Sequence, residues 1–195
     1  VTGVQTCALP ICHGDRRDAV EAGGRGVRVD ALERDPDRLA DLERAAFRTA
    51  RHGETAEVKF KGRHLTLLKP GTYMNLSGKA VGYWLQELKI PKENLLVIVD
   101  DIALPFGHLR MKPRGSSAGH NGLGNIEAVL GGQEYPRLRF GIGNDFAKGG
   151  QVDFVLSNFT PEEFAALTPR INRCVEMIRS FCSAGIERTM NAYNQ

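Results

Sequence analysis

The sequence predicts an α/β fold in which a single domain holds a mixed, twisted β-sheet flanked by helices. From residue 54 to the C-terminus, short runs typical of strands alternate with segments of helical periodicity. This alternation is the pattern of parallel strands joined through helices, so most of the sheet is expected to be parallel. Two of the strand-like runs are instead joined by Lys61-Gly62, which predicts a tight hairpin and makes the sheet mixed.

Size and composition are those of an ordinary globular chain. Its 195 residues are 42% hydrophobic and 25% charged, which suits one domain with a sizeable core. The sequence has no run of about 18 apolar residues, so no membrane-spanning helix is expected. A net charge of +3 is too small to indicate a nucleic-acid partner by itself. The four cysteines lack zinc-ligand spacing and are expected to be buried thiols: Cys7, Cys12, Cys174 and Cys182.

The first 46 residues differ in character from the rest of the chain. The string VTGVQTCALPI resembles a translated sequencing adaptor, so the first dozen or so residues are expected not to be native protein. Between Asp15 and Arg44 acids and bases alternate, and Pro36 interrupts a helix expected over residues 30–47. We therefore expect residues 1–46 to be non-native or disordered, and residues 47–195 to form the domain.

The expected strands follow from alternating or uniformly apolar runs. Glu54–Phe60 alternates as a half-buried strand does, and His64–Leu68 is its returning partner. Leu95–Val99 is apolar throughout, which predicts a strand buried on both faces. Further strands are expected at Gly107–Lys112, Arg137–Gly143 and Gln151–Leu156.

The first two expected helices are marked by apolar residues three and four positions apart. One runs over residues 77–88 and is stopped by Pro91. Its apolar stripe consists of Val81, Trp84, Leu85 and Leu88. The other is expected over residues 120–130.

The third helix is marked by its ends. Thr160-Pro161-Glu162-Glu163 is a capping box with proline at the first helical position. Thr168-Pro169 repeats that start, so the long helix is expected from there to about Ala184. Gly185 is a suitable C-cap, and a short helix is expected to end the chain.

Two carboxylates, Asp100 and Asp101, follow the buried strand directly. Open α/β sheets place their ligand sites at this edge, so we expect the functional site there. Three roles are open for the pair, namely binding Mg²⁺, orienting a histidine, or solvating a loop or helix end. No phosphate-binding glycine motif accompanies the two acids, so the sequence favours metal least.

Small residues lead into His120 and Asn121 at the start of the second expected helix. Such residues let a ligand approach the backbone, and the N–H groups there favour anionic or carbonyl ligands. Asn75 precedes the first helix, where its amide would grip a peptide-like group above an apolar floor of Tyr73 and Met74. For His120 a place in the core is the alternative, and for Asn75 a cap on the helix.

Basic residues two positions apart form two stripes on expected strands. Arg110, Lys112 and Arg114 form one, and Arg137 and Arg139 form the other. Such stripes can follow a phosphate backbone, although a solvated sheet face is the alternative. The sequence has no G-x-S-x-G, no cysteine beside a plausible base and no G-x-G-x-x-G, so it supports neither a serine or thiol nucleophile nor dinucleotide binding.

Four strings together resemble the bacterial peptidyl-tRNA hydrolase family. They are KPGTYMNLSGKAV (69–81), VDDIALPFG (99–107), GSSAGHNGL (115–123) and YPRLRFGIG (135–143). The resemblance implies a monomeric, cytoplasmic α/β hydrolase without a cofactor or bound metal. Its substrate would be peptidyl-tRNA, held by peptide and acceptor stem, and its reaction would be cleavage of the ester between them.

The resemblance also implies roles for particular residues. Asp100 matches the acid that orients and stabilises the catalytic histidine. The residues that would bind the peptide or the tRNA are Tyr73, Met74, Asn75, His120, Asn121, Arg110, Lys112 and Arg139. Two strings typical of the family's start, G-N-P-G and the T-R-H-N that holds its catalytic histidine, do not occur here. His13 lacks the neighbours of that histidine, so we expect this exact chain to lack the base and its activity to be in question.

Two alternatives belong to other classes. One is a non-catalytic RNA-binding module on the same fold, which a missing catalytic histidine would fit. The other is a Mg²⁺-dependent phosphohydrolase that uses Asp100 and Asp101, although a third carboxylate is not evident nearby.

Overall fold

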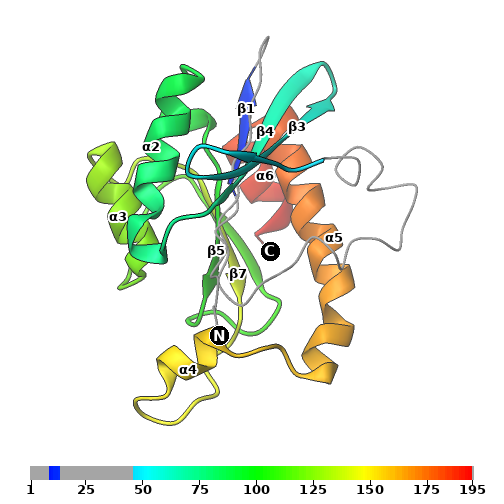
Figure 1. The fold of residues 1–195 in the computed structure, drawn as a ribbon. Coiled ribbons are helices and arrows are strands. Elements are labelled where there is room, and N and C mark those ends of the chain that lie inside the picture. The colour runs from blue at the N-terminus through cyan, green and yellow to red at the C-terminus, as the bar shows by residue number, and fades with distance from the viewer. Residues whose placement is uncertain (1–8, 14–45, 195) are drawn as a thin grey trace.

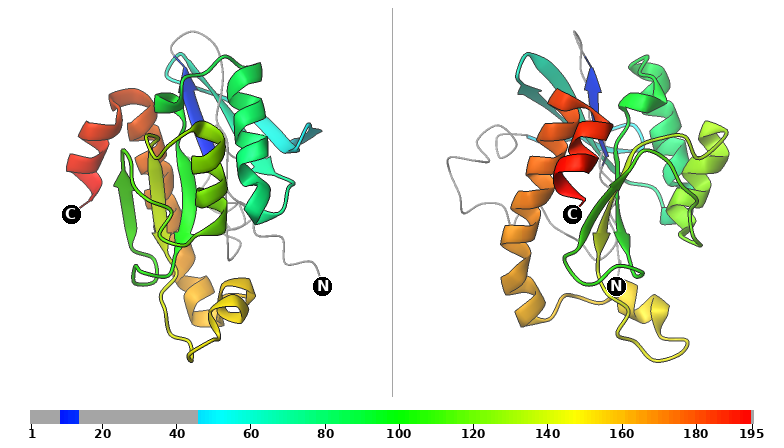
Figure 2. Two further views of the ribbon diagram at one scale, coloured as in Figure 1. Left: turned by 90° about the vertical axis from the view of Figure 1, so that its left-hand side faces the viewer. Right: turned by 180° about the vertical axis from the view of Figure 1, so that it is seen from behind.

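The computed structural model describes residues 9–13 and 46–194 (Figure 1). In this part of the chain the strands form two sheets that lie between two pairs of helices (Figure 2). The helices α2 (Ser77–Glu87) and α3 (Asn121–Leu130) cover one side. The helices α5 (Pro161–Ala184) and α6 (Ile186–Tyr193) cover the other. The expectation of an α/β fold with helices flanking a mixed sheet is confirmed.

The first sheet is antiparallel and has the strand order β1-β4-β3-β2. Its strands are β1 (Leu9–His13), β2 (Arg48–Ala50), β3 (Gly53–Phe60) and β4 (Arg63–Pro70). The hairpin between β3 and β4 pairs Phe60 with Arg63 across Lys61 and Gly62, whose φ angles are 47° and 75°. Two positive φ angles fit the right-handed twist of a hairpin, so the expected tight turn is confirmed.

The second sheet has the order β5-β7-β6 and holds the acids of the expected site. Strand β5 (Val97–Asp101) runs parallel to β7 (Arg137–Gly141), and β6 (Leu109–Lys112) runs antiparallel to β7. Among the described pairs only β5 with β7 is parallel, so the expectation of a mostly parallel sheet is wrong. The reason is that short turns join β2, β3 and β4 in series, and such turns permit only antiparallel pairing.

Two clusters of buried apolar side chains hold the layers together. One joins the strands to α5 and includes Leu138, Phe140 and Ile178. The other joins them to α2 and α3 and includes Val99 and Ile126. The two faces of the strands are therefore both covered, which explains why the run at residues 95–99 is apolar without alternation.

The structure corrects the type of one expected element and the start of two others. Gln151–Leu156 forms the helix α4 and not a strand, because Val152, Val155 and Leu156 repeat at a helical spacing and cover a pocket together. Helix α5 begins at the capping box of Thr160 and continues through Pro169 without restarting. Strand β5 lies two residues later than expected and ends with both acids.

Several expectations concern residues 1–46. Residues 9–13 form β1, which pairs with β4. The helix expected over residues 30–47 lies almost wholly outside the described residues, as do most of residues 1–46.

Cys174 is a buried free thiol as expected, whereas Cys182 is disulfide-bonded, so the expectation of a thiol there is wrong. None of the described helices combines the length and apolar composition needed to cross a lipid bilayer.

Candidate active site

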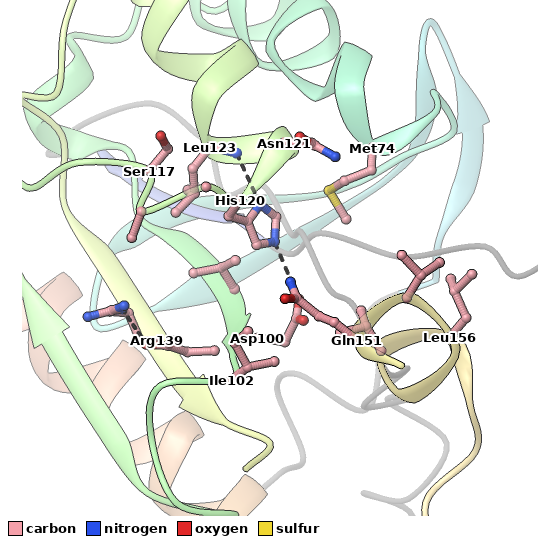
Figure 3. Close-up of a pocket in the computed structure, with 16 residues that line it drawn as sticks. Met74, Asp100, Ile102, Ser117, His120, Asn121, Leu123, Arg139, Gln151 and Leu156 are labelled. Carbon is pink, nitrogen blue, oxygen red and sulfur yellow. Dashed lines mark hydrogen bonds and ion pairs between the residues drawn. The ribbon is translucent and has the colours of Figure 1, made fainter. Parts of the chain in front are cut away.

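A cavity of about 590 Å³ opens where β5 and β7 end and the loop before α3 begins (Figure 3). Helix α4 forms one wall with Val152, Val155 and Leu156. The opposite wall is formed by the start of α3 and by Met74 from the short helix η2 (Met74–Leu76). The pocket therefore joins acidic and polar groups from the sheet edge to an apolar cover from α4.

An acid and an imidazole face each other inside this pocket. His120 Nε2 lies 3.6 Å from Asp100 Oδ1, and their side chains are 20% and 9% exposed. The other ring nitrogen, Nδ1, accepts a hydrogen bond of 3.2 Å from the backbone N–H of Leu123 (Figure 3). Because Nδ1 is an acceptor, the neutral ring carries its proton on Nε2, the nitrogen that faces Asp100.

The distance between Asp100 and His120 is slightly longer than a hydrogen bond. Asp100 Oδ1 is buried and has no hydrogen-bond partner among the described residues. A buried carboxylate oxygen without a donor is costly, so this oxygen is placed to receive a hydrogen bond from a molecule that enters the pocket.

Small residues allow the imidazole to take this position. Ala118 and Gly119 have φ angles of 48° and 85°, which turn the chain sharply just before His120. Gly122 faces both Met74 and His120, and a Cβ there would overlap Met74 Sδ and lie 3.0 Å from His120 Cε1. The glycines of GSSAGHNG thus set the backbone turn and leave room for two pocket side chains.

Asp101 has a different role from its neighbour. Its Oδ1 accepts a 2.9 Å hydrogen bond from the N–H of Ala103. Its Oδ2 lies 2.6 Å from Arg139 Nε, in an ion pair whose alignment is too poor for a regular hydrogen bond. Asp101 is therefore already committed to a turn and to an arginine. Among the described residues no group of three or more His, Cys, Asp or Glu side chains is arranged to hold a metal ion.

Arg137 lies inside the molecule and supports the loop before His120. Its side chain is 2% exposed and lies 3.5 Å from Glu127 Oε1. It donates hydrogen bonds to the carbonyls of Ser116 and Gln133, both at 3.3 Å, and stacks on the Tyr135 ring at 4.2 Å. The interpretation of Arg137 as part of a phosphate-binding stripe is therefore wrong, because burial keeps its guanidinium from RNA.

The structure gathers some of the residues expected at the site and leaves others outside the pocket. Five line the cavity, namely Met74, Asp100, His120, Asn121 and Arg139. Tyr73 and Asn75 do not line it, although they flank Met74, and both are exposed. Arg110 and Lys112 lie on β6 and do not line the pocket, although Arg110 is the direct cross-strand neighbour of the lining residue Arg139.

The wall formed by α4 is not predicted from the sequence, because a strand is expected at Gln151–Leu156. The signal that could have found it is the helical spacing of Val152, Val155 and Leu156. Of the histidines whose side chains the structure describes, only His120 lines this pocket. The backbone of His13 pairs with that of His64, at the end of β4 away from Pro70 and Met74. That His13 is not the catalytic base stays a prediction.

The fold and the pocket define an α/β protein with an acid–imidazole pair at the edge of a mixed sheet. Comparison with known proteins identifies the class. The model of the family described as peptidyl-tRNA hydrolase matches residues 34–195. The peptidyl-tRNA hydrolase of Phocaeicola vulgatus is 57% identical over 159 residues, which cover 82% of this chain and 85% of that protein. That of Porphyromonas gingivalis is 58% identical over 156 residues, covering 80% of this chain and 84% of that protein.

A solved structure agrees with the sequence matches. The crystal structure of peptidyl-tRNA hydrolase from Acinetobacter baumannii has a TM-score of 0.73 at 28% identity, covering 81% of both chains. The chain belongs to the peptidyl-tRNA hydrolase family. The function predicted from the sequence, hydrolysis of the ester between peptide and tRNA, is confirmed at the level of the family. None of these matches supports the alternative of a non-catalytic RNA-binding module.

Proposed function

We propose that this pocket holds the ester junction of peptidyl-tRNA and that Asp100 and His120 act together on the water that cleaves it. The observation that carries the proposal is the buried Oδ1 of Asp100, which has no hydrogen-bond partner in the described part of the chain and lies 3.6 Å from an imidazole Nε2. A water about 2.8 Å from both atoms would accept a hydrogen bond from Nε2–H and donate one to the carboxylate.

The sequence lacks the T-R-H-N string that holds the family's catalytic histidine. In this proposal Asp100 therefore accepts the proton of the water. The water oxygen attacks the ester carbonyl carbon while its proton passes to Oδ1. The bond between the carbonyl carbon and the ribose oxygen then breaks, and that oxygen takes up the proton held by Asp100, so that the peptide leaves as an acid, the ribose as a hydroxyl, and Asp100 is again a carboxylate. A carboxylate is in general a weaker base than an imidazole, so we expect this chain to cleave slowly.

The remaining pocket residues suit the peptide part of the substrate. The Asn121 side chain lies at the start of α3 and lines the cavity, where its amide can donate to the ester or peptide carbonyl. Met74 and the apolar face of α4 offer contacts to the peptide side chains. Tyr73 and Asn75 lie next to Met74 in the chain, and we assign them to the rim of the same cleft.

We assign Arg110, Lys112 and Arg139 to the phosphates of the acceptor stem. Arg110 and Arg139 are direct cross-strand neighbours on β6 and β7. Like charges in this position repel each other, and Asp101 neutralises only the arginine it contacts. A phosphate bound beside them would relieve this repulsion, with an affinity that falls as salt rises.

Four further expectations stay predictions. They are that the chain acts as a monomer, that it acts in the cytoplasm, that it needs no cofactor or metal, and that residues 47–195 form the catalytic domain while residues 1–46 are non-native or disordered.

The test is single-turnover cleavage of peptidyl-tRNA by the purified chain and by its Asp100→Asn variant. Asn keeps the size of the side chain and removes the proton acceptor. We expect slow release of the peptide by the unmodified chain and a further loss of about 100-fold or more in the variant. Equal rates for the two proteins would refute the role of Asp100. Binding of tRNA without any cleavage would favour the non-catalytic RNA-binding module.

A further inference from the structure

A second basic surface lies on α2, on the far side of the pocket mouth from β6. Lys79 and Tyr83 lie four residues apart on α2, so their side chains share one face of the helix, and Asn75 precedes them on η2. The turn between β2 and β3 adds Arg51 and His52 to this face. We call these five residues the α2 ridge. It begins beside the pocket residue Met74 and extends about 12 Å to Tyr83.

Contacts with α2 fix the turn that carries Arg51 and His52. The indole N–H of Trp84 donates a 2.9 Å hydrogen bond to the carbonyl of Arg51. The His52 carbonyl accepts a 2.8 Å hydrogen bond from the N–H of Gly71, and His52 has a φ of 66°. Since these contacts use backbone atoms of the turn, the side chains of Arg51 and His52 are left available on a rigid base.

Within residues 46–194 the cations of the ridge contact aromatic rings and no acidic partner. The Arg51 guanidinium lies 4.8 Å from the centre of the Tyr83 ring, and the His52 ring meets the edge of the same ring at 5.4 Å. Stacking on a ring uses the face of the guanidinium and leaves its N–H groups free to bind an anion. No carboxylate among the described residues forms an ion pair with Arg51 or Lys79.

The pKa of His52 is consistent with a group of neighbouring cations on this face. Partial burial lowers the pKa of its imidazole, and the positive charges of Lys79 and Arg51 lower it further. The cations of the ridge are thus close enough to repel one another, which is unfavourable without a bound anion. A phosphate would relieve that repulsion, and the rings of Tyr83 and His52 could stack on a base.

We propose that the α2 ridge is a second RNA-binding surface, which holds phosphates of the tRNA substrate on the side of the pocket opposite Arg110 and Lys112. The proposal rests on the proposed function, because it takes the ester junction to lie in the pocket next to Met74. RNA leaving the pocket along α2 would meet Lys79 first and Arg51 last, over a length of a few nucleotide steps.

The experiment measures binding of deacylated tRNA by the full chain at several salt concentrations. The variant is Arg51→Ala with Lys79→Ala, and the matched control is Lys59→Ala with Arg188→Ala, two exposed cations on β3 and α6. Losing two phosphate contacts is expected to reduce the slope of log K against log salt by about 1.4, with no change in the control. A ridge variant with the slope of the unmodified chain overturns the proposal.

Two further measurements keep the result interpretable. Arg51→Gln with Lys79→Gln retains side-chain length and must lower the slope as the alanine pair does. If only the alanine pair lowers it, a packing change is the cause and the proposal fails. Cleavage of a peptidyl ester of adenosine is expected to be equal in the ridge variant and the unmodified chain, because this substrate has no phosphate. If the unmodified chain cleaves no ester, the proposed function fails. The salt dependence of tRNA binding still tests whether the α2 ridge binds RNA.

Discussion

His120 turns its Nε2 toward Asp100 because its other nitrogen, Nδ1, caps helix α3 by accepting the N–H of Leu123. The side chain of His120 therefore has two roles. It caps the helix through Nδ1, and this hydrogen bond places the proton of the neutral ring on Nε2, which can donate to a group in the pocket. An imidazole held in this way is a hydrogen-bond donor toward Asp100, and its own lone pair is already used.

The two roles of His120 can be separated by substitution. His120→Ala removes the cap and the donor, and should lower the free energy of unfolding by about 1 kcal/mol as well as the rate of ester cleavage. His120→Asn keeps a good capping side chain and should restore most of that stability without restoring the rate. Urea unfolding and single-turnover cleavage check this. Recovery of the rate by asparagine would show that His120 acts only as a cap.

Gly122 is expected to be intolerant of a side chain for a reason specific to the site. Gly122→Ala would press against Met74 and His120 and should lower ester cleavage at least tenfold, since a displacement of about 1 Å near reacting groups costs that much or more. Gly124 lies in the same helix, and a Cβ there would meet Ser117 Oγ only at 3.8 Å. Gly124→Ala should therefore keep the activity and stabilise the helix by up to about 1 kcal/mol. The pair of variants is compared by kcat and by thermal unfolding.

Arg137 should contribute to stability and to the shape of the loop before His120. Arg137→Met leaves the Glu127 carboxylate and two carbonyls without their donor, so we expect a loss of about 3 kcal/mol or more. Arg114→Met is the control, because its pair with Glu134 is 71% and 59% exposed and should contribute less than about 1 kcal/mol. Chemical denaturation of both variants measures the two losses in the free energy of unfolding. Equal losses would contradict the difference in burial.

Cys174 should not react with thiol reagents in the folded chain. Burial raises the pKa of its thiol to about 12, so the thiolate that reacts with disulfide reagents is scarce at pH 8. Labelling under native conditions should be negligible and should become fast in denaturant. Rapid labelling of Cys174 in the folded protein would contradict its burial.

The same group predicts how stability changes at alkaline pH. The folded pKa lies above the unfolded value, so its contribution is fully present below the unfolded pKa and is lost as pH rises toward about 12. The slope from this group is at most about 1.4 kcal/mol per pH unit. Cys174→Ala should flatten the pH dependence of the free energy of unfolding between about pH 9 and 12 by that amount. An unchanged slope would show that Cys174 is not protonated in the folded state.

Much of the fold could be predicted because its signals are local. The hairpin at Lys61-Gly62, the helix over residues 77–88 and the capping box at Thr160 each depend on neighbours within a few positions. The strand predicted for Gln151–Leu156 is wrong because six residues can satisfy both periodicities, although Val152, Val155 and Leu156 do repeat at a helical spacing. Pro169 does not end the helix, since α5 packs into the core on both sides of it, at Leu167 and at Ile171.

The sequence by itself determined the family, the strand that delivers Asp100 and the loop that delivers His120, because motif strings and apolar runs depend on order along the chain. Only the tertiary structure decided what these groups meet. It paired Asp101 with Arg139, buried Arg137 beneath the loop, and placed Asp100 3.6 Å from the ring of His120. Partners of this kind come from segments far apart in the sequence, and their distances and burial depend on how the sheets and helices pack.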